Sequence, residues 1–305
     1  MQDFRMTTFL SVCRTLNYTR SAAELNITQP AVSQHMAFLE KAYGAKLLTY
    51  QGKKLSLTAA GELLREAAAT MAHDEDTLRE SIAATAGLRR SLHIGMTLTA
   101  GEYVLASCLA AYLTTHNEIQ ARISSDDTRS LLGQLEAGEI DCALVEGVFD
   151  KSAYDWRVFN TQELVAVCAA EHPLAKEEKP RCFEDLLEQH VLVREQGSGT
   201  RAVLVNALAE QNLSVDSFAR VTEVESINII KVLVEAGYGI SFLYEAAVRQ
   251  ELRCGRLARI ALRGRTIEHD FTFLSLKGSV FASQLTCLLD ELECIAKGTH
   301  ALHDR

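Results

Sequence analysis

The sequence predicts an α+β protein with three parts: a small winged helix-turn-helix unit, one long helix, and a domain of two α/β lobes. Three observations support this prediction. Residues 1–58 contain three short helical patterns, residues 59–88 form a proline-free run rich in alanine, and the remainder alternates strand-like with helical segments. A chain of 305 residues is long enough for more than one domain. We therefore expect domain limits at 1–58, 59–88 and 89–305.

Composition excludes several classes of protein. Hydrophobic residues make up 48% of the chain and charged residues 23%, the balance of a globular protein with a real core. The longest apolar run, Tyr103–Leu113, is shorter than the roughly 20 residues that span a bilayer, and the N-terminus lacks a secretion signal. The eight cysteines are scattered without a C-x-x-C pair. We expect a cytoplasmic protein with reduced thiols and no metal ion or cofactor.

Charge is distributed unevenly along the chain. The formal net charge is −9, which taken alone argues against a nucleic-acid partner. Residues 1–58, however, contain seven basic and three acidic side chains, a local net charge of +4, so the remaining chain carries −13. Only the N-terminal unit has the positive balance that phosphate binding requires.

The N-terminal unit is built from three helical patterns and a hairpin. Apolar residues recur at helical spacing from Met6 to Leu16. Thr19 is expected to cap a short second helix, and Thr28 a third that carries Pro30 in its first turn, where a missing N–H costs nothing. Leucines on both sides of Gly52 then indicate a two-stranded wing with a tight turn.

The third helix has the face that DNA reading requires. Val32, Met36, Leu39 and Tyr43 form an apolar stripe, which leaves a small, polar face opposite it. Slim side chains with directed donors and acceptors are needed to reach base edges in the major groove. The candidate DNA-binding residues are Thr28, Gln29, Pro30, Ser33, Gln34, Lys41, Lys53 and Lys54. Gln34 suits an adenine edge and the lysines suit phosphates, although an isolated amphipathic helix on a protein surface would look the same.

The long helix presents a heptad seam. Leu64, Met71, Leu78 and Thr85 recur every seven residues, with Ile82 beside them. Such a seam predicts pairing with a second copy of the same helix. The alternative is an amphipathic helix that packs on its own chain. The acidic run that starts at His73 points in several directions on a helix, so we interpret it as a solvated face rather than a metal site.

The remaining residues alternate strands and helices. The predicted strands are 92–95, 120–124, 141–146, 163–169, 190–194, 220–224, 239–243, 257–262 and 271–276. The predicted helices are 103–113, 128–137, 201–211, 227–236 and 280–296. This alternation predicts two lobes, lobe I at about 89–162 and 268–305 and lobe II at about 163–267.

The stretch from Thr19 to Glu40 resembles, almost position for position, the helix-turn-helix of LysR-type transcriptional regulators. The resemblance continues through Gly44–Leu48 and Leu57–Gly61, and it extends in order along the chain. Tyr50 departs from the family, which usually has an arginine there; Lys53 and Lys54 partly replace that phosphate contact. The family's effector domain is similar to periplasmic binding proteins, so the resemblance implies a small molecule held between two lobes.

Segments of the second half resemble that effector domain. His93–Leu105 resembles its first strand and helix, and Leu131–Gly147 its second helix and third strand. Hydroxyls and free N–H groups at helix starts suit an anionic group, although each hydroxyl alone is equally an ordinary cap. The candidate effector-binding residues are Thr97, Thr99, Thr128, Gly197, Ser198, Gly199, Thr200, Arg201 and Ser226.

The turn Arg194–Arg201 is the sharpest signal in this half. Its glycines permit close approach to a ligand, Ser198 and Thr200 add hydroxyls, and Arg201 adds a fixed positive charge. It resembles the Glu-Pro-Gly-Ser-Gly-Thr-Arg turn of a branch near the regulators of carbon dioxide fixation and sulfur assimilation, with Gln196 in place of proline. The G-x-S-x-G elbow of hydrolases is absent, so Ser198 is not expected to be a nucleophile.

The resemblance implies a regulator without enzymatic activity, with operator DNA and a small-molecule effector as partners. It also implies a dimer through the linker helix and a tetramer of two dimers, and it makes RNA polymerase a further candidate partner. Two other classes stay open from the residues alone. One is an α/β enzyme with a helical appendage, and the other is a metabolite-binding module without DNA function. Thiol-based redox sensing through Cys168 or Cys182 is a weaker alternative, because nothing in the sequence indicates a lowered thiol pKa.

Overall fold

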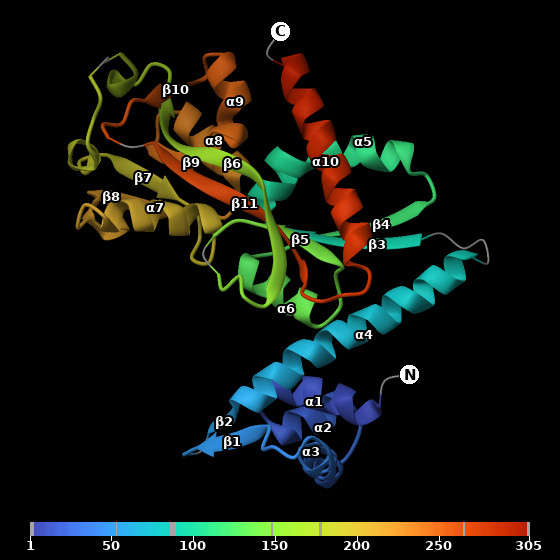
Figure 1. Cartoon of the computed structure of the whole chain (residues 1–305). Coiled ribbons are helices and arrows are strands. Elements are labelled where there is room, and N and C mark those ends of the chain that lie inside the picture. Colours follow the sequence, from blue (N-terminus) through green and yellow to red (C-terminus); the bar gives the residue numbers. More distant parts are fainter. Residues whose placement is uncertain are drawn as a thin grey trace.

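The computed structural model describes residues 3–52, 54–85, 90–147, 149–176, 179–264 and 266–303. Its N-terminal headpiece, which ends at Leu57, joins a two-lobed domain through one long helix, α4 (Ala59–Thr85) (Figure 1). The headpiece consists of α1 (Phe4–Thr15), α2 (Tyr18–Glu24), α3 (Gln29–Tyr43), β1 (Leu48–Gln51) and β2 (Lys54–Leu57). The predicted winged helix-turn-helix is therefore present.

The caps of the headpiece helices differ from the prediction at one place. Thr28 caps α3 as expected, its Oγ1 accepting from the Ala31 N–H at 3.3 Å. Helix α2, however, begins at Tyr18 and is capped by Asn17, whose side-chain oxygen accepts from the N–H groups of Thr19 and Arg20 at 2.9 and 3.0 Å. The predicted Thr19 cap is wrong, because the extended backbone at Asn17 already aims an amide oxygen at the first free donors of the helix.

Helix α4 starts tightly against the wing. Thr58 Oγ1 accepts from the Gly61 N–H at 3.0 Å, and a β-carbon added to Gly61 would lie 2.1 Å from the Leu47 carbonyl oxygen. Glycine is therefore required where the helix crosses the strand entry. The 27 residues of α4 span roughly 40 Å at about 1.5 Å per residue. Residues 86 and 87 of the predicted helix lie outside the described residues.

One nine-stranded sheet runs through both lobes in the order β4-β3-β5-β11-β6-β9-β7-β8, with β10 paired to β6. Strands β3 (Arg90–Met96), β4 (Ile119–Ser125) and β5 (Cys142–Val145) are parallel and form lobe I. Strands β7 (His190–Val193), β8 (Arg220–Glu223) and β9 (Ile240–Tyr244) are parallel and, with β10 (Leu257–Ile260), form lobe II.

Two long antiparallel strands cross between the lobes. These are β6 (Tyr154–Ala169) and β11 (Ile267–Leu276), which pair from Tyr154 to Leu164. The prediction placed strands only at 163–169 and 271–276 and was too short at both places. The reason is that the half of β6 nearest lobe I is mixed polar and apolar, so its pairing with β11 is not visible as an apolar run.

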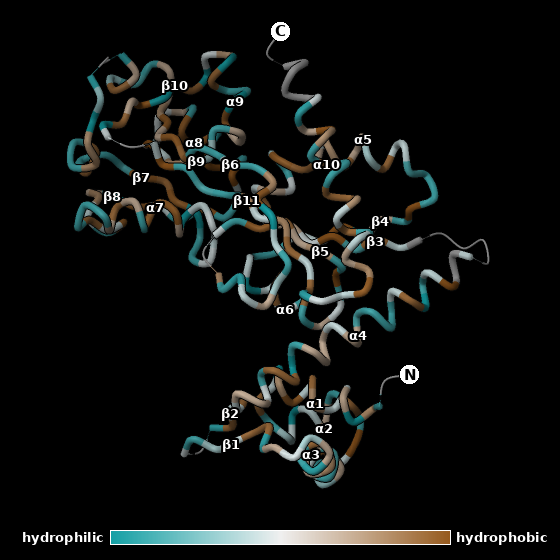
Figure 2. Tube along the Cα trace, in the orientation of Figure 1, coloured by the Kyte–Doolittle hydropathy of each residue, from teal (hydrophilic) through white to brown (hydrophobic). Residues whose placement is uncertain are grey.

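Helices cover both faces of the sheet (Figure 1). Lobe I has η1, a π-helix (Ala100–Leu105), followed by α5 (Ala106–Thr115), α6 (Thr128–Glu136) and α10 (Ala282–His303); lobe II has α7 (Gly199–Ala209), α8 (Ile227–Glu235) and α9 (Glu245–Arg253). Helix α9 was not predicted from the sequence. Hydrophobic residues follow the central strands, whereas α4 alternates in character along its length (Figure 2). No described helix is both long and apolar enough to cross a membrane.

Candidate nucleic-acid interface and effector site

The outward face of α3 is open and polar. Gln29, Pro30, Gln34 and Lys41 are exposed, as is Thr28 at the cap. Ser33 is half-buried and accepts from the Gln29 side-chain amide at 3.0 Å. Seven of the eight candidate DNA-binding residues are described, and six of them share one exposed helix end and face; Lys54 lies on the wing, and Lys53 lies outside the described residues.

The opposite face of α3 anchors it in the headpiece core. Val32, Met36 and Leu39 are buried there against α1 and the wing. Tyr43, predicted to belong to this stripe, is 54% exposed. Tyr43 is exposed because it is the last residue of α3, and Gly44 then turns the chain in the left-handed region at φ 66°.

The basic side chains of the headpiece fall into two groups. Arg5, Arg14 and Lys46 form ion pairs within the headpiece, with Asp3, Glu24 and Glu40 respectively. Lys41, Lys54 and Arg20 are exposed and have no carboxylate partner among the described residues. Arg20 was not singled out from the sequence. Arg20 lies in the first turn of α2, where its N–H is bonded by the Asn17 cap, and this position indicates a further surface cation.

A second polar cluster lies between the lobes, where parallel strands of both lobes end. Thr97 and Thr99 follow β3, Glu146 follows β5, Arg194 follows β7, and Ser198 and Thr200 begin α7. All six side chains are buried, none exposing more than 8% of its surface. We call this group the interlobe site. The carboxyl ends of parallel strands are where open α/β sheets hold their ligands.

Contacts across the lobes assemble the interlobe site. Thr99 Oγ1 of lobe I lies 3.4 Å from Thr200 Oγ1 of lobe II, and Thr200 Oγ1 donates to Glu146 Oε1 at 3.5 Å. A β-carbon added to Gly199 would lie 2.3 Å from Glu146 Cγ. Glycine is therefore needed at this position for the approach of the other lobe. Gly197 beside it has φ 98°, which L side chains rarely adopt.

Glu146 is a buried carboxyl without a full set of partners. Burial raises its pKa to about 7, opposed by the nearby Tyr244 and Thr99 hydroxyls and by the charge of Arg194. Neither Glu146 Oε2 nor the Tyr244 hydroxyl completes a hydrogen bond of normal geometry with the described residues. Sequence analysis did not select Glu146; the signal was an acidic residue that ends the apolar strand Cys142–Val145 directly before a glycine.

Three donors of the same site also lack partners. Arg194 is bound to Glu195 through Nε and Nη2, both at 2.8 Å, but its buried Nη1 has no partner among the described residues. The buried Thr97 Oγ1 and Ser198 Oγ are in the same condition. Ser198 is the N-cap residue of α7, yet its side chain does not cap the helix. Buried polar atoms without partners are rare in folded proteins, so their gathering at one place indicates a ligand site.

The other candidate effector residues take structural roles. Arg201 Nη1 donates to the Arg194 carbonyl at 2.9 Å and also pairs with Glu223, so its charge is already matched. Thr128 Oγ1 donates to the Glu146 carbonyl at 2.6 Å, which fixes the end of β5. Ser226 Oγ accepts from the Ile229 N–H at 3.4 Å and caps α8. The side chains of Thr128 and Arg201 thus contact backbone carbonyls of interlobe-site residues, whereas the printed contact of Ser226 stays within its own helix start.

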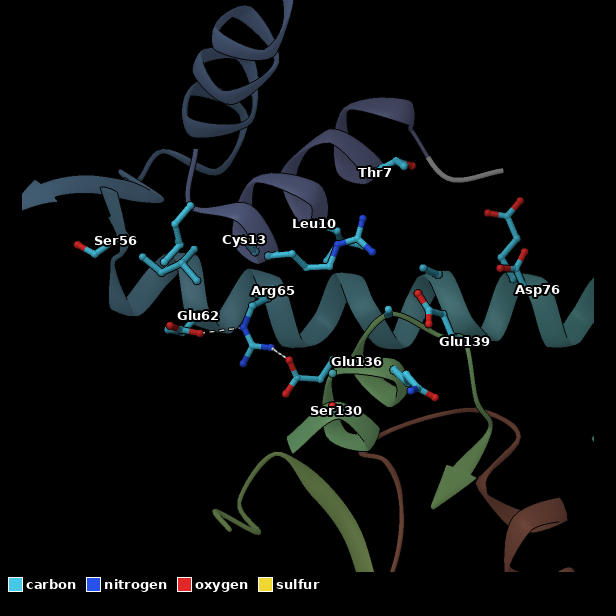
Figure 3. A pocket seen from close by; sticks show the side chains of 18 of the residues that line it. Thr7, Leu10, Cys13, Ser56, Glu62, Arg65, Asp76, Ser130, Glu136 and Glu139 are labelled. Atoms are coloured by element: carbon cyan, nitrogen blue, oxygen red, sulfur yellow. Dashed lines mark hydrogen bonds and ion pairs between the residues drawn. The ribbon is translucent and has the colours of Figure 1, made fainter. Parts of the chain in front are cut away.

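Helix α4 docks on lobe I of its own chain. Arg65 reaches from α4 to Glu136 of α6 at 2.5 Å while holding Glu62 at 2.9 Å (Figure 3). Further along, Asp74 accepts from the Ser279 hydroxyl at 2.5 Å and from the Val280 N–H at 3.0 Å. A cavity of about 980 Å³ lies between α1, α4 and α6 beside Arg65. Helix α4 is thus joined to lobe I by side-chain contacts as well as by the chain itself.

These contacts correct two predictions about α4. Asp74 and the buried His73 face lobe I, His73 lying 3.8 Å from Asp141, so this part of the acidic run is not a solvated face. Leu64 packs partly in the headpiece core rather than in an open seam. The exposed apolar residues of α4 are Leu63, Met71, Leu78 and Ile82. One face of α4 packs on its own chain, and a row of large apolar side chains next to that face is exposed.

Metal binding and thiol chemistry find no support in the geometry. No group of three or more His, Cys, Asp or Glu in the described part of the chain is arranged to hold a metal ion. Burial raises the pKa of Cys168 to about 11, and hydrogen bonding to Asp185 raises the pKa of Cys182. Both thiols are therefore kept protonated, which is the opposite of a reactive thiolate.

Comparison with known proteins identifies both halves. Residues 5–62 match the bacterial regulatory helix-turn-helix protein, lysR family, and residues 85–294 match the LysR substrate binding domain. The chain is 29% identical over 284 residues to the HTH-type transcriptional activator CmpR of Synechocystis, covering 93% of this chain and 92% of that protein. It is 29% identical over 262 residues to the RuBisCO operon transcriptional regulator of Acidithiobacillus ferrooxidans, covering 85% and 83%.

A solved structure shows the same arrangement of parts. Full-length LysG of Corynebacterium glutamicum with bound effector Arg superposes with a TM-score of 0.65, covering 98% of this chain and 99% of that one at 18% identity. Two family models together cover both the headpiece and the lobed domain. The chain therefore belongs to the LysR family, and it is a DNA-binding transcriptional regulator with an effector-binding domain rather than an enzyme.

Proposed function

We propose that this regulator reads its operator with the exposed face of α3 and holds the DNA backbone with the cations around it. The observation that carries the proposal is the coincidence of an uncovered polar helix face with unpaired cations in an otherwise acidic chain. Gln34 is the candidate base reader, with Gln29, Ser33, Thr28 and Pro30 along the same surface. Lys41, Lys53, Lys54 and Arg20 are the candidate phosphate contacts, because cations bind phosphates without reading sequence.

Gel-shift titration of the full chain against the DNA upstream of its own gene tests the proposal. We expect an affinity that falls steeply with salt, since each neutralised phosphate releases counterions. Competition with unrelated duplex of the same length separates operator reading from backbone binding. Equal affinity for both duplexes at every salt concentration contradicts sequence reading by α3.

The effector half is proposed to bind a small molecule with an acidic group at the interlobe site. Its support is the set of buried donor atoms on Thr97, Ser198 and Arg194 that have no hydrogen-bond partner in the described part of the chain. They lie beside the start of α7, an 11-residue helix whose first N–H groups receive no side-chain cap. A helix N-terminus together with free hydroxyls favours an anionic group. Thr99, Thr128, Gly197, Gly199, Thr200, Arg201 and Ser226 complete the candidate set.

Thermal unfolding of the full chain in the presence of small carboxylic and phosphoric acids tests this site. We expect at least one of them to raise the unfolding temperature of the wild type and to lose that effect in Ser198→Ala. Ser217→Ala is the matched control, because Ser217 is exposed and lies in a separate turn of lobe II. An equal response of the two variants to every acid rejects Ser198 as part of the site.

Assembly is proposed to use the uncovered row of α4. Leu63, Met71, Leu78 and Ile82 expose between 49% and 70% of their surfaces, and such a row is covered when two copies of the helix pair. A dimer through α4 and a tetramer of two dimers follow for a cytoplasmic regulator of this kind, with RNA polymerase as a further partner on DNA. A ligand alters this assembly only by its different affinities for two arrangements of lobes or subunits.

A further inference from the structure

Glu146 is the one acidic side chain of the interlobe site as defined above. It is 2% exposed, and its Oε2 has no hydrogen-bond partner of normal geometry among the described residues. Acids bind well to hydroxyls and N–H groups, but a second carboxylate repels them. The site therefore combines donors that lack an acceptor with a carboxyl that accepts from Thr200 at Oε1 but completes no hydrogen bond at Oε2 among the described residues. Its ligand has to satisfy both.

The groups around Glu146 leave its charge incompletely balanced. Arg194 faces it from the end of β7, but that guanidinium is already held by Glu195 in a two-bond contact. Tyr244 faces it from the end of β9, with its own pKa raised by burial and by the Glu146 charge. His269 of β11 accepts from the Gly147 N–H at 2.8 Å, and burial lowers its pKa, so it is neutral there. Arg194 is the one cation in this set, and it faces two carboxylates, Glu146 and Glu195.

We propose that the effector of this regulator is a small acid that also carries a hydrogen-bond donor, a hydroxyl or an ammonium group, and that Glu146 binds this donor while Thr97, Ser198 and Arg194 bind the acid group. The inference rests on the proposed effector function of the interlobe site and makes its ligand class narrower. Acids whose second polar group is anionic are disfavoured when Glu146 is ionised, because the two negative charges repel each other.

The protonation of Glu146 predicts how the affinity for the effector depends on pH. With a pKa of about 7, the carboxyl of the unliganded protein is mostly protonated at pH 6 and mostly ionised at pH 8. A ligand donor competes with that proton, so affinity is expected to rise about tenfold from pH 6 to pH 8. A ligand that places a second anion beside Glu146 has the opposite dependence, because it binds best when the carboxyl is neutral.

Titration calorimetry on the full chain with matched acids tests the proposal. The probes are propionate, lactate, alanine and malonate, which share a three-carbon skeleton and differ in donor or second anion, together with the corresponding four- and five-carbon sets. We expect the hydroxy or amino member of one set to bind at least tenfold more tightly than its donor-free and dicarboxylic counterparts, and more tightly at pH 8 than at pH 6.

Glu146→Gln is expected to abolish the pH dependence and to weaken that ligand at least tenfold. Glu251→Gln is the matched control, because Glu251 is also buried but is paired with Lys231 and Arg256 within lobe II. Preferential binding of a dicarboxylate, affinity that falls as pH rises, unchanged binding by Glu146→Gln, or no binding of any donor-bearing acid each overturns the proposed class. Gel shifts on the same samples measure DNA binding separately. If a donor-free acid binds and Ser198→Ala abolishes that binding, the interlobe effector site is supported although the proposed ligand class is wrong.

Discussion

The exposed face of α3 and the interlobe site are both polar, but they are prepared for their ligands in opposite ways. On α3 the side chains are solvated, so DNA exchanges water for phosphate and base contacts one group at a time. At the interlobe site Thr97, Glu146, Arg194 and Ser198 are already out of water, and each has one buried polar atom without a hydrogen-bond partner among the described residues. Leaving buried polar groups unpaired costs about 1–3 kcal/mol each. A ligand that pairs these buried groups therefore recovers that free energy, whereas the solvated groups of the DNA surface offer no such gain.

The largest effect is expected at the DNA surface, where changes leave stability alone. Gln34→Ala combined with Lys54→Ala should weaken operator binding by about 2–4 kcal/mol, from one lost base contact and one lost phosphate contact. The unfolding temperature should not move, because both side chains are exposed. Fluorescence anisotropy with labelled operator measures the change, and Lys176→Ala, on the surface of lobe II, is the control. Wild-type affinity in the double variant would remove α3 from the interface.

Glu146 contrasts most with the DNA surface, because its burial lowers the free energy of unfolding. Its folded pKa of about 7 lies above the ordinary value of 4.5, so the folded protein retains a proton that the unfolded chain releases. Stability therefore falls as pH rises from about 4.5 to 7, by about 3 kcal/mol in all. Glu146→Gln should lack this fall. Thermal unfolding of both proteins at pH 5 and pH 8 measures it, and parallel pH profiles would contradict a raised pKa.

Gly199 tests whether the contact between the lobes is as close as described. A β-carbon there meets Glu146 Cγ, so Gly199→Ala should destabilise the protein by about 1–3 kcal/mol. Gly133→Ala is the control, since its added β-carbon would meet nothing within 4 Å. Combining Gly199→Ala with Glu146→Ala should restore part of the loss, as measured by urea unfolding. A loss that is equal in the single and double variants would mean that the strain lies elsewhere.

The smallest effect is expected at the docking of α4 on lobe I, which connects the part of the chain that contains the DNA surface with the part that contains the interlobe site. Arg65→Ala removes the pair with Glu136, which is partly solvated, so the cost is at most about 1 kcal/mol. Arg79→Ala is the control, because the ion pairs of Arg79 among the described residues are with Glu75 and Asp76 of α4 itself. We expect Arg65→Ala, and not Arg79→Ala, to reduce the effect of an effector on DNA affinity. An unchanged effect in gel shifts would show that coupling does not pass through Arg65.

The sequence predicted the outward face of α3 more completely than the interlobe site, because the first depends on local pattern and the second on contacts between distant residues. The outward face of α3 follows from helical periodicity alone, because residues three and four apart share a face wherever the helix lies. Thr28, Pro30 and Gly44 mark the ends of that helix locally. The errors at Thr19 and Tyr43 concern only the positions of caps and ends, where two polar residues with one residue between them can each cap a helix and where a helix stops.

The interlobe site was predicted only in part. The hydroxyls at Thr97, Thr99, Ser198 and Thr200 follow from helix starts and from the family turn. Glu146 and Arg194 of the site, and Tyr244 beside Glu146, were missed. Each stands at the end of a strand, and its role depends on the neighbouring strand ends in the sheet order β5-β11-β6-β9-β7. Arg201, the clearest cation of the turn, is engaged by Glu223, a pairing that no local pattern indicates.

The sequence by itself determined the three-part organisation, the family, the basic headpiece within an acidic chain, and the reading face of α3, since all of these rest on local periodicity, charge and motif. Only the tertiary structure decided which face of α4 meets lobe I, which cations remain unpaired, and which carboxyl is buried between the lobes. These properties depend on contacts between residues such as Arg65 and Glu136, or Gly199 and Glu146, that lie far apart along the chain, and on the removal of water that those contacts bring about.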